Sequence, residues 1–413
     1  MSSDSVAIFG EGTFEEQIQE LVNYVVRSKS EEERPASIRP YQDALKTEED
    51  ATPLAEDDER RRKVLLMVLA DVQSLGEGSE KEIEGFFNLI YAHLLTLFPA
   101  DSPDVKTSVT ALIKTISSAP VEQATIKYRL LSNLFNTLPR KSPLRLQVYT
   151  TILQLATSRE ELEALQLTRV DVERWLLEWD VSAEEKSSFL KLISEAYRQA
   201  QQLPTSYEYS IAYVRSLSAG SPSSETAAVE LIATALRLPF VFDFDPLFKL
   251  DAVVAAKDHE LFGLLHIFLN DSLPAFSAWA DAHPAAFETY HLNKSQLARK
   301  IRLLTLASLG FKNIGQDLPY SKIAEALQVE ASEVEKWVID VIRAGLLSGK
   351  LSQTAQTVRV IRATSRSFEK EQWELLEKRL VAWKTGLAGV LDVVAAARKQ
   401  AVPSSVLQAQ VAA

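Results

Sequence analysis

The sequence predicts an all-α-dominated fold, a helical-repeat solenoid of the TPR or HEAT type capped by a winged helix and followed by a long C-terminal helix. Helix-start signals recur at Ser102, Ser142, Ser182 and Ser221, either as Ser-Pro or as a capping box. Their spacing of about 40 residues leaves room for two helices and two turns, as in stacked helical hairpins. After residue 293, two helical patterns precede two short strand patterns, which indicates a winged helix.

The composition restricts the class of protein. The 413 residues suffice for two or three domains, and only 13 glycines favour helix over sheet. The absence of cysteine excludes disulfides, thiolate metal sites and a cysteine nucleophile. The N-terminus lacks a signal-peptide pattern, and no run of about 18 apolar residues predicts a membrane span. We therefore expect a soluble cytosolic or nuclear protein with no membrane partner.

Residues 1–59 are predicted to form an acidic, largely flexible head with one amphipathic helix. Residues 1–60 hold 16 acidic and 6 basic residues, so a net charge of −10 out of the chain's −11 lies here. Prolines beside glutamate clusters predict a flexible linker over Ser28–Glu59. We expect the head to be dispensable for folding of the body. The predicted helix, expected to dock on the body or on a partner, carries Phe14, Ile18, Leu21, Val22 and Val25.

Residues 60–292 are predicted to form the helical-repeat arm. Apolar patterns predict helices over Val64–Leu75 and Ile83–Phe98, with glycines between them. The pairs Ala119-Pro120 and Leu203-Pro204 mark breaks inside the repeats. Further apolar stretches over Leu261–Leu269 and Phe276–Tyr290 continue the arm. Aromatic clusters are interpreted as structural rather than as ligand sites. The cluster Phe240, Phe242, Phe244 and Phe248 lies at a bend and is expected to wedge successive repeats together, and Trp175 and Trp179 are expected in the core; the other dense cluster is Tyr207, Tyr209 and Tyr213.

Residues 293–366 are predicted to form the winged-helix module. A helix around Leu297 is followed by a short helix over Pro319–Leu327. The next helix is expected to start at Ser332, where Glu335 completes a capping box. Its apolar stripe is centred on Trp337, which we therefore expect in the core: Val334, Trp337, Val338, Val341 and Ile342.

The wing is predicted to consist of two strands that follow helix-breaking glycines at 345 and 349. The strand patterns cover Gly349–Gln353 and Thr357–Ile361. We expect the second strand to lie at a sheet edge, where a neighbouring protein can extend the sheet by strand addition. The predicted interface residues of the wing are Thr357, Val358, Arg359, Val360 and Ile361.

The charge of the helix over Ser332–Leu346 argues against nucleic-acid recognition. It carries three acidic and two basic residues, whereas a helix that enters a phosphate-lined groove needs a basic surface. The wing is more basic, and contact with nucleic acid through Arg359, Arg362 and Arg366 stays open as an alternative. A solvated basic edge or a protein contact is the favoured interpretation.

Residues 367–400 are predicted to form one long helix, followed by a disordered tail over residues 401–413. Apolar residues alternate at four and three positions, as in a coiled coil. The helix either folds back onto its own module or enters a bundle with helices of other chains, and its large apolar surface favours the bundle. The predicted interface residues are Leu376, Leu380, Trp383 and Leu387.

No motif predicts catalysis, a cofactor or a metal site. His259 opens a helix like that of zinc proteases, but Gly263 stands where the second histidine belongs. Gly345–Leu351 resembles a phosphate-binding loop but is one residue short between its glycines and ends on Leu instead of Ser or Thr. We expect a protein that is not an enzyme and has no cofactor.

The chain resembles the PCI-domain family and, within it, the subunit M family of eukaryotic translation initiation factor 3. The resemblance covers about residues 60–390 and is specific in the winged helix and in the Leu-Leu-Ser-Asn-Leu-Phe stretch at residues 130–135. It leaves the acidic head unmatched. The stretches that carry it are Arg129–Phe135, Ser142–Tyr149, Lys300–Thr305, Val334–Arg343 and the aromatic positions Phe368, Trp373 and Trp383.

The resemblance implies a cytoplasmic, non-catalytic scaffold in that multi-subunit factor. Its implied partners are other PCI-domain subunits and MPN-domain subunits, and the small ribosomal subunit through the complex. It implies support for preinitiation-complex assembly and for recruitment of initiator tRNA and mRNA, without direct nucleic-acid binding. Two alternatives stay open: a scaffold of the COP9 signalosome or proteasome lid, and a nucleic-acid-binding winged-helix protein.

Overall fold

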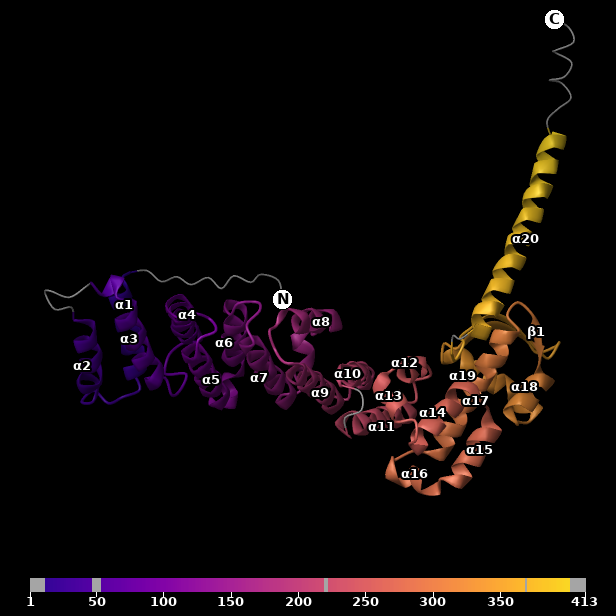
Figure 1. Cartoon of the computed structure of the whole chain (residues 1–413), viewed down its shortest axis with the longest axis horizontal. Coiled ribbons are helices and arrows are strands. Elements are labelled where there is room, and N and C mark those ends of the chain that lie inside the picture. The colour runs from indigo at the N-terminus through magenta and orange to yellow at the C-terminus, as the bar shows by residue number, and fades with distance from the viewer. Residues whose placement is uncertain (1–11, 47–52, 219–221, 368–369, 402–413) are drawn as a thin grey trace, which may run out of the picture. The chain divides into compact units, whose positions relative to one another are not determined.

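The computed structural model describes residues 12–46, 53–218, 222–367 and 370–401 (Figure 1). It divides into two compact units, Met1–Leu217 and Ser218–Ala413. The division falls inside the predicted arm rather than at residue 293. The boundary lies before residue 293 because side-chain contacts join the helices after residue 222 to the winged helix.

The first unit is a helical-repeat solenoid whose helices stack in chain order (Figure 1). Each step between the sequence marks at residues 102, 142 and 182 contains two α-helices, as predicted. The helices are α1 Phe14–Val26, α2 Arg34–Leu45, α3 Asp58–Asp71, α4 Glu80–Leu97, α5 Pro103–Ser118, α6 Ala124–Thr137, α7 Leu144–Ser158, α8 Arg169–Glu178, α9 Ala183–Gln199 and α10 Leu203–Ser216.

Two of the predicted helix-start signals, Ser102 and Ser182, are confirmed as caps. Ser102 caps α5 by accepting a hydrogen bond from the Val105 amide, and Ser182 forms a capping box with Glu185. Ser142 differs from the prediction, because the cap position of α7 falls one residue later, on Pro143; the Ser142 hydroxyl still accepts a hydrogen bond from the Leu144 amide at 3.4 Å. Ser221 lies outside the described residues. Local side-chain chemistry therefore sets the helix starts of the repeats.

The prediction of a flexible linker over Ser28–Glu59 is wrong where α2 forms. Tyr41 of α2 is buried, and its hydroxyl donates a hydrogen bond to Asp71 Oδ2 at 2.7 Å. Pro35 stands in the first turn of α2, where a missing N–H costs no helical hydrogen bond. The acidic composition of the segment predicted disorder, but the burial of Tyr41 is enough to order this helix.

The predicted amphipathic helix is confirmed as α1 and docks on its own unit. Its apolar face joins the main core, with Ile18, Leu21 and Val22 almost fully buried. The Tyr24 hydroxyl donates to the Leu75 carbonyl at 2.7 Å, and its ring stacks on Phe86. The head is therefore part of the solenoid core rather than an appendage.

The centre of the first unit is an aromatic cluster contributed by α6, α7, α8 and α9. Trp175 and Trp179 stack with ring centroids 5.7 Å apart, and Trp179 is fully buried. The expectation that this pair lies in the core is confirmed for Trp179, whereas Trp175 is partly buried against the same core. Their neighbours in the cluster are Phe135, Tyr149 and Phe189.

His93 of α4 makes the docking of α1 sensitive to pH. It is buried edge-to-face against Phe14, at 5.3 Å between ring centroids. Burial, together with the Arg61 guanidinium, lowers the pKa of His93 to about 4. Between pH 6.5 and about 4 the unfolded chain binds a proton that the folded chain resists, so stability is lost as the pH falls through this window.

We expect this histidine to contribute on the order of 3 kcal/mol of pH-dependent stability. Urea denaturation of wild type and of a His93→Leu variant, compared between pH 7 and pH 4, measures the effect as the difference between the two pH slopes. A His266→Gln variant, which replaces a half-exposed histidine, is the control and should keep the wild-type slope. Equal slopes for wild type and His93→Leu would contradict the prediction.

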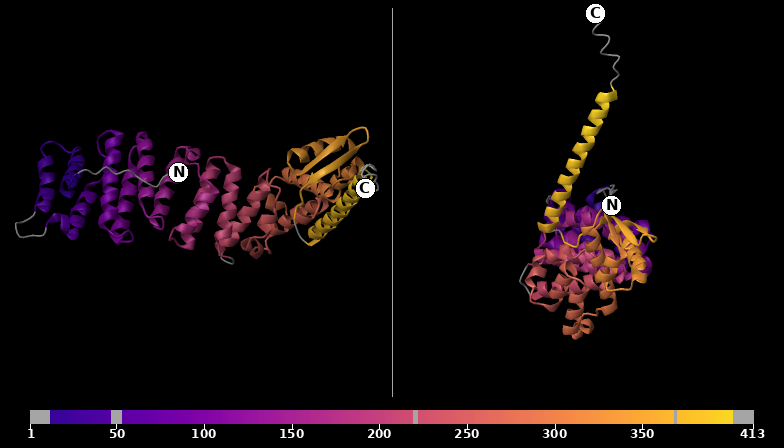
Figure 2. Two further views of the ribbon diagram at one scale, coloured as in Figure 1. Left: turned by 90° about the horizontal axis from the view of Figure 1, so that it is seen from above. Right: turned by 90° about the vertical axis from the view of Figure 1, so that its right-hand side faces the viewer.

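The second unit contains further helices and a winged helix with a three-stranded antiparallel sheet (Figure 2). The prediction of a winged helix after a helical solenoid is confirmed. The elements are α11 Pro222–Arg237, α12 Asp245–Phe248, α13 Asp251–Ala255, α14 Glu260–Asn270, α15 Leu273–Ala282, α16 Pro284–Thr289, α17 Lys294–Lys312, β1 Asp317–Pro319, α18 Tyr320–Leu327, α19 Val334–Arg343, β2 Leu347–Ser352, β3 Thr357–Ala363 and α20 Lys370–Ala401.

The start of α19 differs from the predicted capping box. Residues 331–333 form a single 3-10 turn, and the cap position falls on Glu333, whose side chain makes no capping hydrogen bond. The predicted pair Ser332 and Glu335 is therefore not the cap of this helix. The helix ends as predicted, since Gly345 has a φ of +75° that few other residues tolerate.

Candidate protein-interaction site

The wing strand predicted to lie at a sheet edge is in fact the central strand. The sheet order is β1-β3-β2, so β3 pairs with β1 on one side and with β2 on the other. Arg359 is aligned with Asp317 in β1 and with Lys350 in β2. The prediction of strand addition at Thr357–Ile361 is wrong, because the short segment 317–319, which carries no strand pattern, occupies that edge. An Arg359→Pro change would break the sheet itself.

The longer of the two edge strands is β2, which therefore takes over as the candidate for strand addition. Gly349 lies at a register shift of this strand, and a Cβ atom there would stand 2.6 Å from the Arg359 carbonyl oxygen. Only glycine fits this close approach without displacing the backbone. Gly349 therefore shapes the wing rather than ending a helix.

The three wing arginines have different surroundings. Arg366 donates from Nε to the Leu304 carbonyl at 3.1 Å and from Nη2 to Thr305 Oγ1 at 3.0 Å, and it also bonds the carbonyls of Phe268 and Asp271. Burial lowers the pKa of Arg366 to about 10. The candidate role of Arg366 in nucleic-acid contact is wrong, since its guanidinium ties the wing to α14 and α17. For Arg359, which pairs with Asp317, and for exposed Arg362 that role stays a prediction.

Helix α20 presents apolar side chains to solvent along the part of it that the structure describes. Leu376, Leu380, Trp383 and Leu387 are 37%, 52%, 67% and 47% exposed. These side chains do not pack on the winged helix of their own chain, which was one of the two predicted alternatives. Near its start the helix is held by Arg379, which donates to the Phe311 carbonyl at 2.7 Å and lies over the Phe311 ring.

Exposed apolar surface of this extent is typical of sites that contact a protein or a membrane. Residues 372–398 are also long and apolar enough to cross a membrane, judged by length and composition alone. No uninterrupted apolar run of about 18 residues lies in this helix, because charged residues are interspersed along α20 and only its average hydropathy is high. A helix that packs into a bundle has the same length and composition.

Trp337 is half-buried rather than in the core of the winged helix. Val334, Val338 and Val341 of α19 are buried, whereas Trp337 packs at the side of this core beneath the Arg302 guanidinium, which lies 5.6 Å from its ring centre. The tryptophan also lines a cavity of about 550 Å³ between α18 and the start of α19. The prediction that Trp337 lies in the core is wrong, because only the three valines of the apolar face are fully covered by neighbouring elements.

We therefore expect Trp337→Ala to cost about 1–2 kcal/mol of unfolding free energy, less than the ~3–5 kcal/mol typical of a fully buried tryptophan. Chemical denaturation of the full chain measures the change. Ile339→Ala, on the exposed side of the same helix, is the control and should change stability by less than about 0.5 kcal/mol. A loss as large as that for a core tryptophan would contradict the half-buried position.

Lysine and arginine side chains of α17 cap helix ends in this unit, and little in the sequence indicates it. Lys300 of α17 donates to the carbonyls of Ala235 and Leu238 at 2.8 and 2.7 Å, at the end of α11. Arg302 donates to the Leu327 carbonyl at the end of α18. Burial lowers the pKa of Lys300 to about 7. The only signal was a lysine within the apolar pattern of α17, between Leu297 and Ile301.

His259 and Phe244, which lie in motifs that resemble functional sites, have structural roles. His259 caps α14, with Nδ1 accepting from the Leu261 amide at 3.1 Å, and its Nε2 lies 3.1 Å from the Tyr290 hydroxyl. Phe244 packs on Phe268. Across the residues that the structure describes, no group of three His, Cys, Asp or Glu side chains has metal-binding geometry. The remaining candidates are surfaces for contact with other molecules.

Two family models match this chain. The model described as "PCI domain" matches residues 279–362, from within α15 almost to the end of β3. The model described as "eIF3 subunit M, C-terminal helix" matches residues 366–394, which contain Arg366 and most of α20. The exposed helix is therefore a recognisable feature of known proteins.

Curated relatives are similar over almost the whole chain. A protein of Aspergillus terreus is 35% identical, over 99% of this chain and 91% of its own length. Proteins of Phaeosphaeria nodorum and Coccidioides immitis are 33% and 31% identical, over 94% and 100% of this chain and 88% and 93% of their own lengths. All three carry the name "Eukaryotic translation initiation factor 3 subunit M".

Proposed function

Because this chain belongs to the family of subunit M of eukaryotic translation initiation factor 3, we propose that it serves as a non-catalytic scaffold in that factor. Similarity over nearly the full length of named relatives carries the proposal. The relatives' name favours the initiation factor over the COP9 signalosome and the proteasome lid, which the sequence left open. The finer role is to support preinitiation-complex assembly on the small ribosomal subunit, and recruitment of initiator tRNA and mRNA, in the cytoplasm.

The apolar surface of α20 supports a role in assembly. Helices with exposed residues at alternating steps of four and three bury them against other helices. Leu380 and Trp383, both more than half exposed, would be central to such a bundle, and PCI-domain and MPN-domain subunits are the proposed partners. The charge of α19 supports assembly through protein rather than through direct nucleic-acid contact.

The edge of β2 offers a second contact on the same unit. Strand addition supplies main-chain hydrogen bonds, and Leu351 on β2 is 39% exposed. Two contacts on one subunit raise the effective concentration of each for the other. Loss of either contact should therefore weaken assembly by more than its own area suggests.

Affinity purification of the tagged full chain from its own cells, followed by mass spectrometry, tests the proposal. We expect subunits of the initiation factor in comparable amounts, together with proteins of the small ribosomal subunit, and we expect the factor subunits to persist after nuclease treatment. Recovery of signalosome or proteasome-lid subunits in their place would overturn it. Loss of all factor subunits on nuclease treatment would favour the nucleic-acid alternative, in which binding by Arg359 and Arg362 weakens steeply with salt.

A further inference from the structure

Two arginines, one just before α20 and one near its start, both bind the backbone of α17. Arg366 donates to the Leu304 carbonyl and to Thr305 Oγ1. Arg379 donates to the Phe311 carbonyl. Leu304 and Phe311 lie on the same side of α17, about two turns or roughly 10 Å apart, because they are seven residues apart in one helix. The two arginines therefore hold one face of α17 at two separate points.

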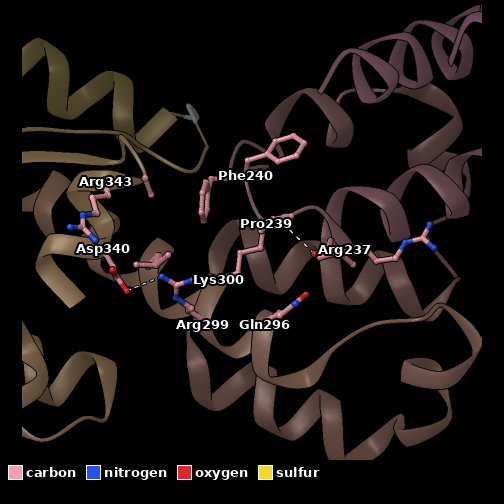
Figure 3. Close-up of a pocket in the computed structure, with 12 residues that line it drawn as sticks. Arg237, Pro239, Phe240, Gln296, Arg299, Lys300, Asp340 and Arg343 are labelled. Carbon is pink, nitrogen blue, oxygen red and sulfur yellow. Dashed lines mark hydrogen bonds and ion pairs between the residues drawn. The ribbon is translucent and has the colours of Figure 1, made fainter. Parts of the chain in front are cut away.

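Helix α17 is a firm support, because side chains along it join three other elements of the unit. Lys300 donates to carbonyls at the end of α11, and Arg299 pairs with Asp340 of α19 at 2.8 Å (Figure 3). Gly310 lies so close to the wing that a Cβ atom there would stand 2.6 Å from Leu347 Cδ1 of β2. A segment that is held on α17 at two points therefore takes a defined direction relative to the winged helix.

Beyond Arg379, α20 is exposed along the part of it that the structure describes. Every described side chain from Leu380 to Arg398 is exposed, whereas Arg379 is half-buried. This part of the helix is about 28 Å long, at 1.5 Å per residue. A change of about 20° in direction at Arg379 would move its far end by about 10 Å, which is the usual distance between the axes of two packed helices. A small freedom at the start of α20 would therefore misplace its apolar face by the width of a helix.

The bonds of each arginine suit a different part of this task. Besides α17, the Arg366 guanidinium bonds the Phe268 and Asp271 carbonyls at the end of α14. The planar guanidinium donates in several fixed directions at once, whereas a lysine ammonium is a compact point charge. Arg366 therefore fixes the orientation of the segment that precedes α20. Arg379 combines one carbonyl bond with a place over the Phe311 ring, and a lysine can make both contacts.

We propose that Arg366 and Arg379 form a two-point clamp on α17, which sets the direction of α20 and so positions its apolar face for partner helices. Neither arginine needs to touch the partner. The proposal rests on the proposed function, because it takes a helical bundle as the destination of α20. A helix that already points in the bound direction loses less conformational freedom on binding, and this raises its affinity.

Distances within the isolated full chain test the clamp directly. The chain has no cysteine, so spin labels can be attached at Thr385→Cys on α20 and Lys322→Cys on α18, both at exposed positions. Double electron–electron resonance should give one narrow distance distribution for the labelled chain. Arg366→Gln and Arg379→Gln should each replace it by a broad distribution. A second label pair, Lys322→Cys with Lys350→Cys, reports on the winged helix itself and should keep its distance in every variant.

Co-purification from the cells of origin measures the consequence for assembly. The variant that carries both Arg366→Gln and Arg379→Gln should recover about tenfold less of the factor subunits than wild type does. Arg379→Lys keeps the charge and the reach to Phe311, so it should retain the narrow distance distribution and the recovery of wild type. Lys378→Gln removes the same charge from the adjacent exposed position and should leave both measurements unchanged.

The two measurements separate failure of the clamp from failure of the proposed function. A narrow distribution in the arginine variants, or wild-type recovery of factor subunits despite a broad distribution, would overturn the clamp. Where Arg366→Gln also disturbs the winged-helix pair, Arg379→Gln at the half-buried point of the clamp decides. Absence of factor subunits with the unaltered chain would overturn the proposed function, and the distances would still show whether the arginines set the direction of α20.

Discussion

Removal of residues 368–413 is expected to abolish entry of the chain into its complex while leaving both units folded. The deleted segment contains α20, whose Leu380 and Trp383 side chains are more than half exposed and contribute little to the core. Arg379, which contacts Phe311, helps to hold the start of α20 on the rest of the unit. Thermal unfolding should shift by only a few degrees, whereas co-purified factor subunits should fall by about tenfold or more.

Point variants separate loss of the helix from loss of its apolar surface. Leu380→Glu and Trp383→Glu place a charge on the proposed bundle face, and both should reduce co-purification strongly. Thr385→Glu adds the same charge to an exposed polar position of α20 and should have a small effect. Undiminished recovery of factor subunits with the truncated chain would contradict the prediction and would leave the solenoid or the edge of β2 as the main docking surface.

Removal of residues 1–57 is expected to destabilise the first unit severely, in contrast to what the acidic composition alone predicts. The deletion takes away α1 and α2 and exposes the core that Ile18, Leu21 and Tyr41 cover. Burial of each such side chain is worth about 1.5–3 kcal/mol. The thermal midpoint of this unit should fall by about 10 °C or more, measured by circular dichroism or calorimetry.

A single substitution tests the same contact without removing the segment. Leu21→Ala should cost ~2–5 kcal/mol, since the side chain is almost fully buried. Glu20→Ala, at the adjacent exposed position, should change stability by less than about 0.5 kcal/mol. A chain shortened by residues 1–57 that unfolds at the wild-type temperature would show that α1 is an appendage after all.

The sequence by itself determined the features that depend on local chemistry and periodicity. The caps Ser102 and Ser182 set helix starts, because their side chains bond amides a few residues away. The apolar patterns of α1 and α20 each predicted one continuous apolar face, because helical periodicity determines which residues share a side of the helix. The packing of Trp175 against buried Trp179, at the end of α8, followed from the same spacing.

Only the tertiary structure decided which strand lies at the edge, which charges are buried and which apolar residues stay partly exposed. Three residues of β1 make β3 central, and nothing in so short a segment indicates a strand. Lys300 and Arg366 look like surface cations in sequence, yet each finds the free carbonyls of a helix end far along the chain. Trp337 and Phe240 remain partly exposed because neighbours distant in sequence stop short of covering them. Sequence periodicity shows which side of a single helix or strand is apolar. Burial and hydrogen-bond partners depend instead on which elements pack against one another.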